Sequence, residues 1–308
     1  MKTTTNFDAI SNRFKKRYRH LAKWAKGQRI DYFRLYDRDL PEAPLVIDAL
    51  PNHWVVWVTE HVASDETDLL VHVKQTLCEL NDGEVIIKHR KKKNNIKQHY
   101  FQEDTIIEVQ EGGLTFKLNL TRYLDVGLFI DHRNARQLIR KEATGKRVLN
   151  LFAYTGSFGC YALAGGANFV TSVDLNPRYS EWQEENYKLN HFKPNQYSII
   201  TADVMQFLTN NKSKYDIVIC DPPSFSHSKR KGAKLFQIQD DANTIIKGCL
   251  KALKPTGWLF FSTNYRRFNM DKAIDGLSIQ VNELSRQLVS KDFEAAAPAR
   301  SWRLSKIS

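Results

Sequence analysis

The sequence predicts an α/β protein in which an open parallel sheet, with helices on both faces, follows a smaller N-terminal α/β module. From Val148 onward, short apolar runs alternate with segments long enough for helices, which is typical of a parallel sheet covered on both sides. Polar residues also recur where the runs end, at Asp174, Asp203 and Asp221. Because the carboxyl ends of parallel strands meet at one edge, a binding site is expected there.

The size and charge of the chain limit its function. With 308 residues it can bury a sizeable core, most simply in two domains. Its hydrophobic content of 42% and charged content of 26% are ordinary for a globular protein. The formal net charge of +12 is not ordinary. It predicts a polyanionic partner, most simply nucleic acid, with a generally basic surface as the alternative.

The cysteine spacing and the hydropathy of the chain indicate in which cellular compartment the protein is expected. The four cysteines are widely spaced and form no C-x-x-C pair, so neither a metal site nor a disulfide framework is predicted. This fits a reducing cytoplasm, and the N-terminus lacks the apolar core of a signal peptide. The uncharged stretch 148–173 carries glycines, asparagines and hydroxyl residues in a βαβ rhythm. We interpret it as buried core and expect no membrane association.

Residues 1–30 are predicted to form a basic N-terminal helix. Apolar residues recur at helical spacing over 7–26, and basic residues, including Arg17, fill the remaining positions. An RNA-facing helix, a scaffold helix, a membrane-surface helix and a solvated face are all open interpretations here. The following 31–120 are predicted to form a small α/β module. Its expected strands are 31–36, 44–49, 54–61 and 84–89, with a helix at 66–80 and a hairpin across 105–119.

A basic run occupies 88–97 within this module, and Tyr100 and Phe101 follow it. Basic side chains neutralise phosphates and aromatic rings stack on bases, so the run predicts an RNA contact. An ordinary solvated loop is the alternative. We therefore interpret the small module as RNA-binding.

Residues 121–308 are predicted to form the sheet domain. It begins with a short apolar strand over 125–133, where Asp131 is expected to cap a helix over 134–142 and to lie at the edge of a cofactor pocket. The later predicted helices lie near 177–190, 203–210, 234–252 and 271–289, and the later predicted strands near 169–173, 197–201, 215–220, 257–263 and 301–307.

A strand, a tight turn and a helix start follow one another over Val148–Gly159. Such a turn lets backbone N–H groups approach a cofactor. Asp174 ends the next strand, 24 residues after Asn150. A carboxylate there suits a ribose diol, because it accepts hydrogen bonds from both hydroxyl groups. The full G-x-G-x-x-G pattern is absent, so this signal alone also fits an ordinary βαβ unit.

A second turn follows the strand at 215–220 and has the sequence Asp221-Pro222-Pro223-Ser224-Phe225. Prolines cannot continue a central strand, and Pro222 restricts Asp221 to an extended conformation. The turn is therefore rigid, and it places an aromatic ring just behind a carboxylate at the edge where open α/β sheets bind ligands.

This acid-Pro-Pro-x-aromatic turn resembles the target-base motif of S-adenosylmethionine-dependent nucleic-acid methyltransferases. Together the motifs NLFAYTGSFG, GLFIDHR, SVDLN, TADV and CDPPSFSHSK resemble one group closely. They are similar to the guanine-N7 methyltransferase half of the bifunctional 23S ribosomal RNA methyltransferases, the RlmKL family, over nearly the whole chain. The resemblance implies a Rossmann-like class I methyltransferase sheet, S-adenosyl-L-methionine as cofactor, and methyl transfer to N7 of a guanine in 23S rRNA.

The resemblance also implies roles for individual residues. The stretch Asn150–Ser157 would hold the methionine part of the cofactor, Asp174 the ribose, and Asp203 with Val204 the adenine. The expected cofactor-binding residues are Asn150, Phe152, Tyr154, Thr155, Gly156, Ser157, Asp174, Leu175, Asp203, Val204, Asp221 and Asp131. The expected base-pocket residues are Asp221, Pro222, Pro223 and Phe225. The expected RNA-binding residues are Arg17, Arg90, Lys91, Lys92, Lys93, Lys97, Lys229, Arg230, Arg266 and Arg267.

Other functions remain open from the sequence. A cytosine-C5 methyltransferase needs a cysteine nucleophile, and the end of the fifth strand has none; strand alternation should turn Cys220 away from Asp221. An exocyclic-amine methyltransferase uses a similar motif, which Ser224 only weakly disfavours. A non-catalytic ribosome assembly factor need not keep both Asp174 and Asp221. A nicotinamide dehydrogenase has no support from the Asp-Pro-Pro turn or the charge.

The expected partners follow from the same resemblance. The substrate would be 23S ribosomal RNA or a large-subunit precursor. In the bifunctional enzymes this unit follows a guanine-N2 methyltransferase half, which this chain lacks. A separate guanine-N2 methyltransferase is therefore a further expected partner.

Overall fold

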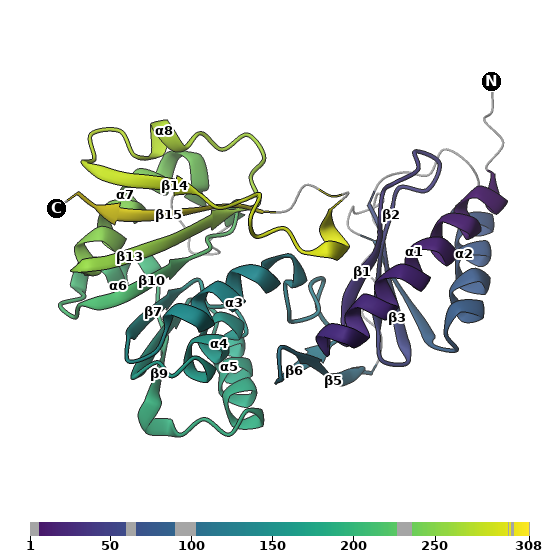
Figure 1. Ribbon diagram of the computed structural model, residues 1–308, viewed down its shortest axis with the longest axis horizontal. Coiled ribbons are helices and arrows are strands. Elements are labelled where there is room, and N and C mark those ends of the chain that lie inside the picture. The colour runs from purple at the N-terminus through teal and green to yellow at the C-terminus, as the bar shows by residue number, and fades with distance from the viewer. Residues whose placement is uncertain are drawn as a thin grey trace. The chain divides into compact units, whose positions relative to one another are not determined.

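The computed structural model describes residues 6–59, 66–89, 103–226, 236–294, 296 and 299–307. The chain divides into two compact units (Figure 1). Unit 1 comprises 1–130 together with 291–297, and unit 2 comprises 131–290 together with 298–308. The predicted boundary after residue 120 lies ten residues before this division.

Unit 1 is built on a four-stranded sheet with the order β1-β2-β3-β4. Neighbouring strands are antiparallel except β3 and β4, which are parallel and separated in sequence by α2. The elements are α1 (Phe7–Gln28), β1 (Phe33–Asp37), β2 (Leu45–Leu50), β3 (His53–Val58), α2 (Glu66–Leu80), β4 (Glu84–His89), and the hairpin of β5 (Ile106–Glu111) and β6 (Leu114–Asn119). All of these elements were predicted, within a few residues at their ends.

The apolar spacing of α1 explains its position. Ile10, Phe14, Leu21 and Ala25 recur on one face and are buried in a core shared with the sheet and α2. Helices α1 and α2 pack side by side, and α1 also contacts β1 (Figure 1). The membrane-surface interpretation of α1 is therefore not supported, because its apolar face is already covered.

Unit 2 contains a seven-stranded sheet with the order β14-β15-β13-β10-β7-β8-β9. Strands β13, β10, β7, β8 and β9 run parallel, and β15 is antiparallel to both β13 and β14. The strands are β7 (Arg147–Leu151), β8 (Phe169–Asp174), β9 (Tyr197–Thr201), β10 (Tyr215–Cys220), β13 (Leu253–Thr263), β14 (Ile279–Glu283) and β15 (Arg300–Lys306). The predicted parallel sheet is confirmed.

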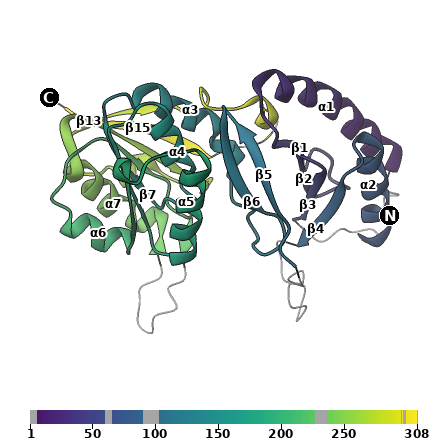
Figure 2. The ribbon, with the colours of Figure 1, turned by 90° about the horizontal axis from the view of Figure 1, so that it is seen from below.

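Helices cover both faces of this sheet (Figure 2). The contacts group α3, α4 and α5 in one layer and α6, α7 and α8 in the other. Their bounds are α3 (Arg133–Glu142), α4 (Ser157–Ala164), α5 (Pro177–Leu189), α6 (Val204–Asn210), α7 (Ile238–Ala252) and α8 (Met270–Ala273). The parallel order brings the carboxyl ends of β7, β8, β9, β10 and β13 to one edge, as predicted.

Two sequence predictions for the sheet domain are wrong. The helix predicted over 271–289 is only the short α8, because Gly276 takes a left-handed conformation (φ 71°) and the chain continues as β14, which pairs with β15. The strand predicted over 125–133 is absent; a 3₁₀ helix spans Ile130–His132. As a result Asp131 does not cap α3, whose N-cap residue is His132, without a side-chain capping bond.

No helix among the described residues is both long enough and apolar enough to span a membrane.

Candidate active site

The turn after β7 is strongly bent. Phe152, Tyr154 and Gly156 all adopt left-handed conformations, with φ of 54°, 49° and 80°, and the chain then enters α4. Non-glycine residues in this region store strain, which a fold retains only when its surroundings enforce it. Here α5 supplies the support: Asn186 Nδ2 donates a hydrogen bond of 2.8 Å to Thr155 O. The turn therefore holds its backbone in a fixed form at the sheet edge.

Gly156 is required for packing as well as conformation. A Cβ atom at this position would lie 3.0 Å from Cγ of Gln183, on α5. No larger residue fits without moving that side chain. The close approach of loop and helix leaves the N-terminus of α4 directly after the turn, where unpaired backbone N–H groups favour anionic ligand groups.

Asp174 is the last residue of β8, and its side chain is hydrogen-bonded to the turn after β7. Its Oδ2 accepts a hydrogen bond of 2.9 Å from Tyr154 N, and its Oδ1 accepts one of 3.0 Å from Asn176 N. Burial raises the pKa of Asp174, and the backbone N–H groups only partly offset this. Beside it, the side chain of Leu175 is 53% exposed. The carboxylate and an exposed apolar surface thus lie together at the predicted cofactor edge.

Asn150 supplies a different signal. Its side chain lies on β7 and is buried, yet Nδ2 has no hydrogen-bond partner among the described residues. A buried donor without a partner costs free energy, so such groups often mark a ligand position. The Asn150 amide, the left-handed turn and Asp174 belong to adjacent strand ends, and together they fit a ligand with both polar and apolar parts.

Asp203 and Val204 lie at the end of β9. Asp203 caps α6, because its Oδ1 accepts a hydrogen bond of 2.9 Å from Gln206 N. The Val204 side chain is buried in the core, with 3% exposed. A contact between Val204 and adenine would therefore involve its backbone rather than its side chain, and the adenine roles stay predictions.

Asp221 is the centre of a polar cluster in which His132 and Ser262 are buried and Asp221 itself is partly exposed; of these three the sequence predicted Asp221. Its Oδ2 lies 3.1 Å from His132 Nε2, and its Oδ1 accepts a hydrogen bond of 2.6 Å from Ser262 Oγ. The sheet register explains the second contact: Cys220 pairs with Phe261, so the next residues of the two strands stand side by side. His132 reaches the cluster from the start of α3. We call these three residues the Asp221 cluster.

The cluster holds two opposite charges at neutral pH. Burial lowers the pKa of His132, but the negative charges of Asp221 and Asp131 outweigh it and raise that pKa to about 9. For Asp221, burial raises the pKa, yet His132 and Ser262 together hold it below its ordinary value. Asp221 is therefore a fixed anion and a poor base.

Aromatic residues lie next to this cluster. Pro222 is buried, whereas Pro223 is exposed and the side chain of Phe225 is 56% exposed. The ring of Phe225 meets that of Tyr265 edge to face, with centroids 6.0 Å apart. Tyr265 follows β13, so the ends of two neighbouring strands present a pair of rings, on which a planar base can stack.

Cys220 points away from the site, as strand alternation predicted. Its side chain is fully buried in the core of unit 2, where Cys249 is its neighbour. Burial raises its pKa well above the ordinary value, so the thiol stays protonated. It does not supply a nucleophile at the sheet edge.

The expected RNA-binding residues have different outcomes. Arg17 is held within unit 1: its Nε donates 2.6 Å to Leu35 O, and its Nη1 lies 3.6 Å from Asp39. These partners hold its guanidinium within unit 1, and its role as an RNA contact stays a prediction. Arg266 and Arg267 are exposed just after β13 and stay predictions. The remaining residues lie outside the described part of the chain: Arg90, Lys91, Lys92, Lys93, Lys97, Lys229 and Arg230.

The sequence analysis missed three site residues. His132 lies inside the quoted GLFIDHR motif, next to Asp131, and could have been noticed as a titratable residue there. Ser262 could have been found from strand register, as the parallel neighbour of Asp221. Tyr265 gave no signal beyond its position after the fifth strand.

Comparison with known proteins agrees with this geometry. The family model for S-adenosylmethionine-dependent methyltransferases matches residues 76–293. The chain belongs to this family. Its cofactor is S-adenosylmethionine, as the sequence resemblance implied, and the Rossmann-like fold class is confirmed. The strained turn, the unpartnered Asn150 amide and the Asp174 carboxylate are suited to such a cofactor, which has a charged amino-acid part and a ribose.

Curated relatives include ribosomal RNA large subunit methyltransferases K/L. Those of Shewanella loihica and Vibrio cholerae are each 37% identical to this chain, over 93% and 92% of it. The chain spans 42% of the length of each of these relatives.

Solved structures support the fold. The protein SMU.776 in complex with SAH has a TM-score of 0.81 and 21% identity, covering 99% of this chain and 83% of its own. The M. jannaschii tRNA m1G37 methyltransferase has a TM-score of 0.57 and 16% identity, covering 96% of this chain and 79% of its own. At these identities the likeness concerns the fold alone.

Proposed function

We propose that this chain transfers a methyl group from S-adenosylmethionine to N7 of a guanine in 23S ribosomal RNA. One observation carries the proposal: Asp221, at the edge of the expected base pocket, is held as an anion by His132 and Ser262 beside the exposed ring of Phe225. The names of the K/L relatives and the net charge of +12 favour ribosomal RNA as the substrate. With ribosomal RNA as the substrate, either free or in an assembling subunit, the proposed reaction takes place in the cytoplasm.

N7 of guanine suits a site without a strong base. This atom carries an in-plane lone pair and no proton, so no general base and no covalent nucleophile is required. When bound, the cofactor supplies an electrophilic methyl group. The residues of the chain must orient the base and tolerate the positive charge that develops on it. A fixed Asp221 carboxylate serves the second need, and stacking on Phe225 serves the first.

We assign the cofactor to the edge formed by β7, β8 and β9. The backbone after β7 and the Asn150 amide would bind the methionine part, and the Asp174 carboxylate would accept hydrogen bonds from the ribose hydroxyl groups. Leu175 offers its exposed side chain to the adenine. Asp131 precedes His132 in the chain and its charge acts on that side chain, and we assign it to the edge of the same pocket.

Two rival reactions have less support from the site. Methylation of cytosine C5 needs an attacking thiolate, and the buried Cys220 offers none. Methylation of an exocyclic amine needs acceptors for the amine protons, and each oxygen of Asp221 already has one contact, to His132 or to Ser262. A non-catalytic assembly factor would not need an intact cofactor edge. A separate guanine-N2 methyltransferase remains part of the proposal, as a partner.

The test is methyl transfer to deproteinised 23S rRNA, followed by borohydride and aniline treatment, which cleaves the strand at N7-methylguanine. We expect scission at one guanine with the wild-type protein. At saturating cofactor, the Asp221→Asn variant should methylate about 10- to 100-fold more slowly, because a charge-assisted interaction worth about 1.5–3 kcal/mol is removed. A methylated product that resists scission would overturn the N7 assignment and favour carbon or amine methylation.

A further inference from the structure

The cations of α1 fall into two sets, and the first set is neutralised within unit 1. Arg13 donates a hydrogen bond of 2.7 Å from Nε to Asp39, which Arg17 also approaches. Lys15 lies 2.8 Å from Glu79 of α2. These side chains flank the buried face of the helix, so they serve the packing of unit 1.

The second set has no such partner. Lys16, Arg19, Lys23 and Lys26 are exposed, and none makes a hydrogen bond or ion pair with the described residues. We call these four residues the outer basic face. The α1 sequence contains a single acid, Asp8, which lies in the first turn.

Helical geometry places the outer basic face opposite the core. At 3.6 residues per turn, the four side chains fall within an arc of about 80°. Phe14, Leu21 and Ala25, which pack into unit 1, point in the opposite direction by the same arithmetic. From Lys16 to Lys26 the face extends about 15 Å along the helix axis. It is therefore a narrow line of like charge rather than scattered basic residues.

This arrangement does not stabilise the free protein. Like charges three or four positions apart repel each other and destabilise a helix by about 0.2–0.5 kcal/mol per pair. The apolar face already accounts for the position of α1, so folding does not require these cations. An external polyanion would relieve the repulsion, and an anionic membrane is disfavoured because no apolar residues of α1 remain free to insert.

We propose that the outer basic face binds the phosphate backbone of the substrate RNA. This rests on the proposed function, which supplies RNA as the polyanion. The interaction depends on charge and spacing, so it contributes affinity without reading sequence. Arg17, the RNA contact predicted from the sequence, lies on the neutralised side of the same helix.

The test compares two triple variants with the same net charge. Lys16→Ala/Arg19→Ala/Lys23→Ala removes most of the outer basic face. Lys141→Ala/Lys212→Ala/Lys247→Ala removes three exposed lysines of unit 2, which lie on α3, in the loop after α6 and on α7. Binding of a single-stranded 23S rRNA fragment is measured across a range of salt concentrations. Circular dichroism and S-adenosylmethionine affinity serve as checks that both variants are folded.

We expect the α1 variant to bind RNA at least about tenfold more weakly at low salt. The slope of log K against log salt should become shallower by about 0.7 for each phosphate that the variant no longer neutralises, or about 2 in all. The unit 2 control should keep the wild-type slope. An unchanged slope in the α1 variant, or an equal change in both variants, would overturn the inference. If the slope changes as expected but the wild-type protein gives no N7 product, the RNA-binding role of α1 stands and the proposed function fails.

Discussion

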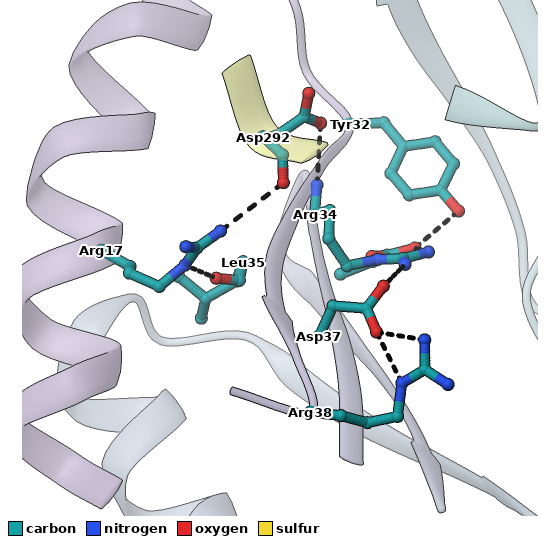
Figure 3. Close-up of polar contacts among 8 residues, drawn as sticks. Arg17, Tyr32, Arg34, Leu35, Asp37, Arg38 and Asp292 are labelled. Atoms are coloured by element: carbon teal, nitrogen blue, oxygen red, sulfur yellow. Dashed lines mark hydrogen bonds and ion pairs between the residues drawn. The ribbon is translucent and has the colours of Figure 1, made fainter. Parts of the chain in front are cut away.

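Two clusters of opposite charges among the described residues, one in each unit, differ in what surrounds them. In unit 1, Arg34 contacts Asp48 through Nε and Nη2 and donates 2.8 Å from Nη1 to Asp37. Tyr32 donates 3.0 Å to the same Asp48, and Phe293 lies under the guanidinium, 4.9 Å from its carbon to the ring centroid. Figure 3 shows the polar groups facing one another. We call this set the Arg34 cluster.

The Arg34 cluster is closed. Asp48 is fully buried, and the backbone N–H of Arg34 donates 3.1 Å to Asp292, which is also buried. Arg17 donates to the backbone oxygen of Asp292 as well (Figure 3). The Asp221 cluster is open by contrast, because the side chain of Asp221 is 22% exposed and the exposed Phe225 and Pro223 follow it. Buried charge by itself therefore does not indicate a functional site, and the feature that distinguishes the Asp221 cluster is its access to solvent beside an exposed aromatic ring.

The largest expected effect breaks the closed cluster. Replacing Asp48→Asn leaves the largely buried Arg34 without its main counter-charge, which should lower the free energy of unfolding by about 3–5 kcal/mol. Urea denaturation measures the loss, with the exposed Asp82→Asn as control. Cofactor affinity should remain at the wild-type value at temperatures where the variant is folded. A stable variant with weakened cofactor binding would contradict a structural role for this cluster.

The open cluster should respond to pH. His132 has a folded-state pKa of about 9 against an ordinary value of 6.5. A raised pKa contributes stability that is fully present below pH 6.5 and is lost as the pH rises through about 9, here about 3 kcal/mol. Asp221 has the opposite sign: its pKa is lowered from 3.8, so its contribution is lost on acidification.

Unfolding free energies at pH 6.5 and pH 9.5 check this for the wild type and for His132→Gln. The wild type should lose stability between these values, and the variant should lose clearly less. The other charges facing His132 are Asp131 and Arg136, and His132→Gln leaves both in place. Equal losses in the two proteins would mean that His132 does not titrate as described.

The cofactor edge gives the next effect. Asp174→Ala should weaken S-adenosylmethionine binding at least about tenfold, because hydrogen bonds to a charged group are worth about 1.5–3 kcal/mol. Isothermal calorimetry measures the affinity, with the exposed Asp271→Ala as control. Unchanged affinity in Asp174→Ala would move the ribose to another part of the edge.

The sequence predicted the parts of unit 2 that depend on short-range pattern. Apolar runs located the parallel strands, and the polar residues that end them, such as Asp174 and Asp221, did meet at one edge. The apolar spacing gave wrong predictions where a segment's structure depends on pairing with a strand that is distant in the sequence. Over 271–289 an antiparallel partner, β15, turns part of a predicted helix into a strand. That strand lies more than fifteen residues away, so local spacing gave no indication of it.

Charged residues were harder to predict than strands. For Arg17, a helical pattern does not show that Asp39 lies beside it. His132 is buried against a carboxylate 89 positions later in the chain. Asp292 lies 258 positions from its partner Arg34. A sequence shows the sign of the charge on a side chain, but only the fold shows whether a nearby opposite charge already neutralises it.

The exposed ring beside the open cluster gives a smaller effect. Phe225→Ala should weaken RNA binding because a stacking interaction worth about 1–3 kcal/mol is removed. Because Phe225 packs only against Tyr265 among the aromatic pairs of the described residues, the free energy of unfolding should hardly change. Steady-state kinetics with 23S rRNA measure the effect, and Phe225→Tyr should restore much of it. A loss of stability equal to the loss of binding would show that the ring is part of the core.

The smallest effect on the rate is expected at Cys220. This residue is next to Asp221 in sequence, but its thiol lies in the core beside Cys249 and its pKa is raised, so it takes no part in the open cluster. Cys220→Ser should keep most of the methyl-transfer rate, while burial of a hydroxyl group lowers the free energy of unfolding by about 1–3 kcal/mol. Cys249→Ser, which changes the neighbouring cysteine, should have the same effect on the rate and on the free energy of unfolding. Rates at saturating cofactor and RNA measure the outcome. A folded, cofactor-binding Cys220→Ser protein without any activity would defeat the N7 mechanism, because a reaction at an unprotonated ring nitrogen needs no thiol.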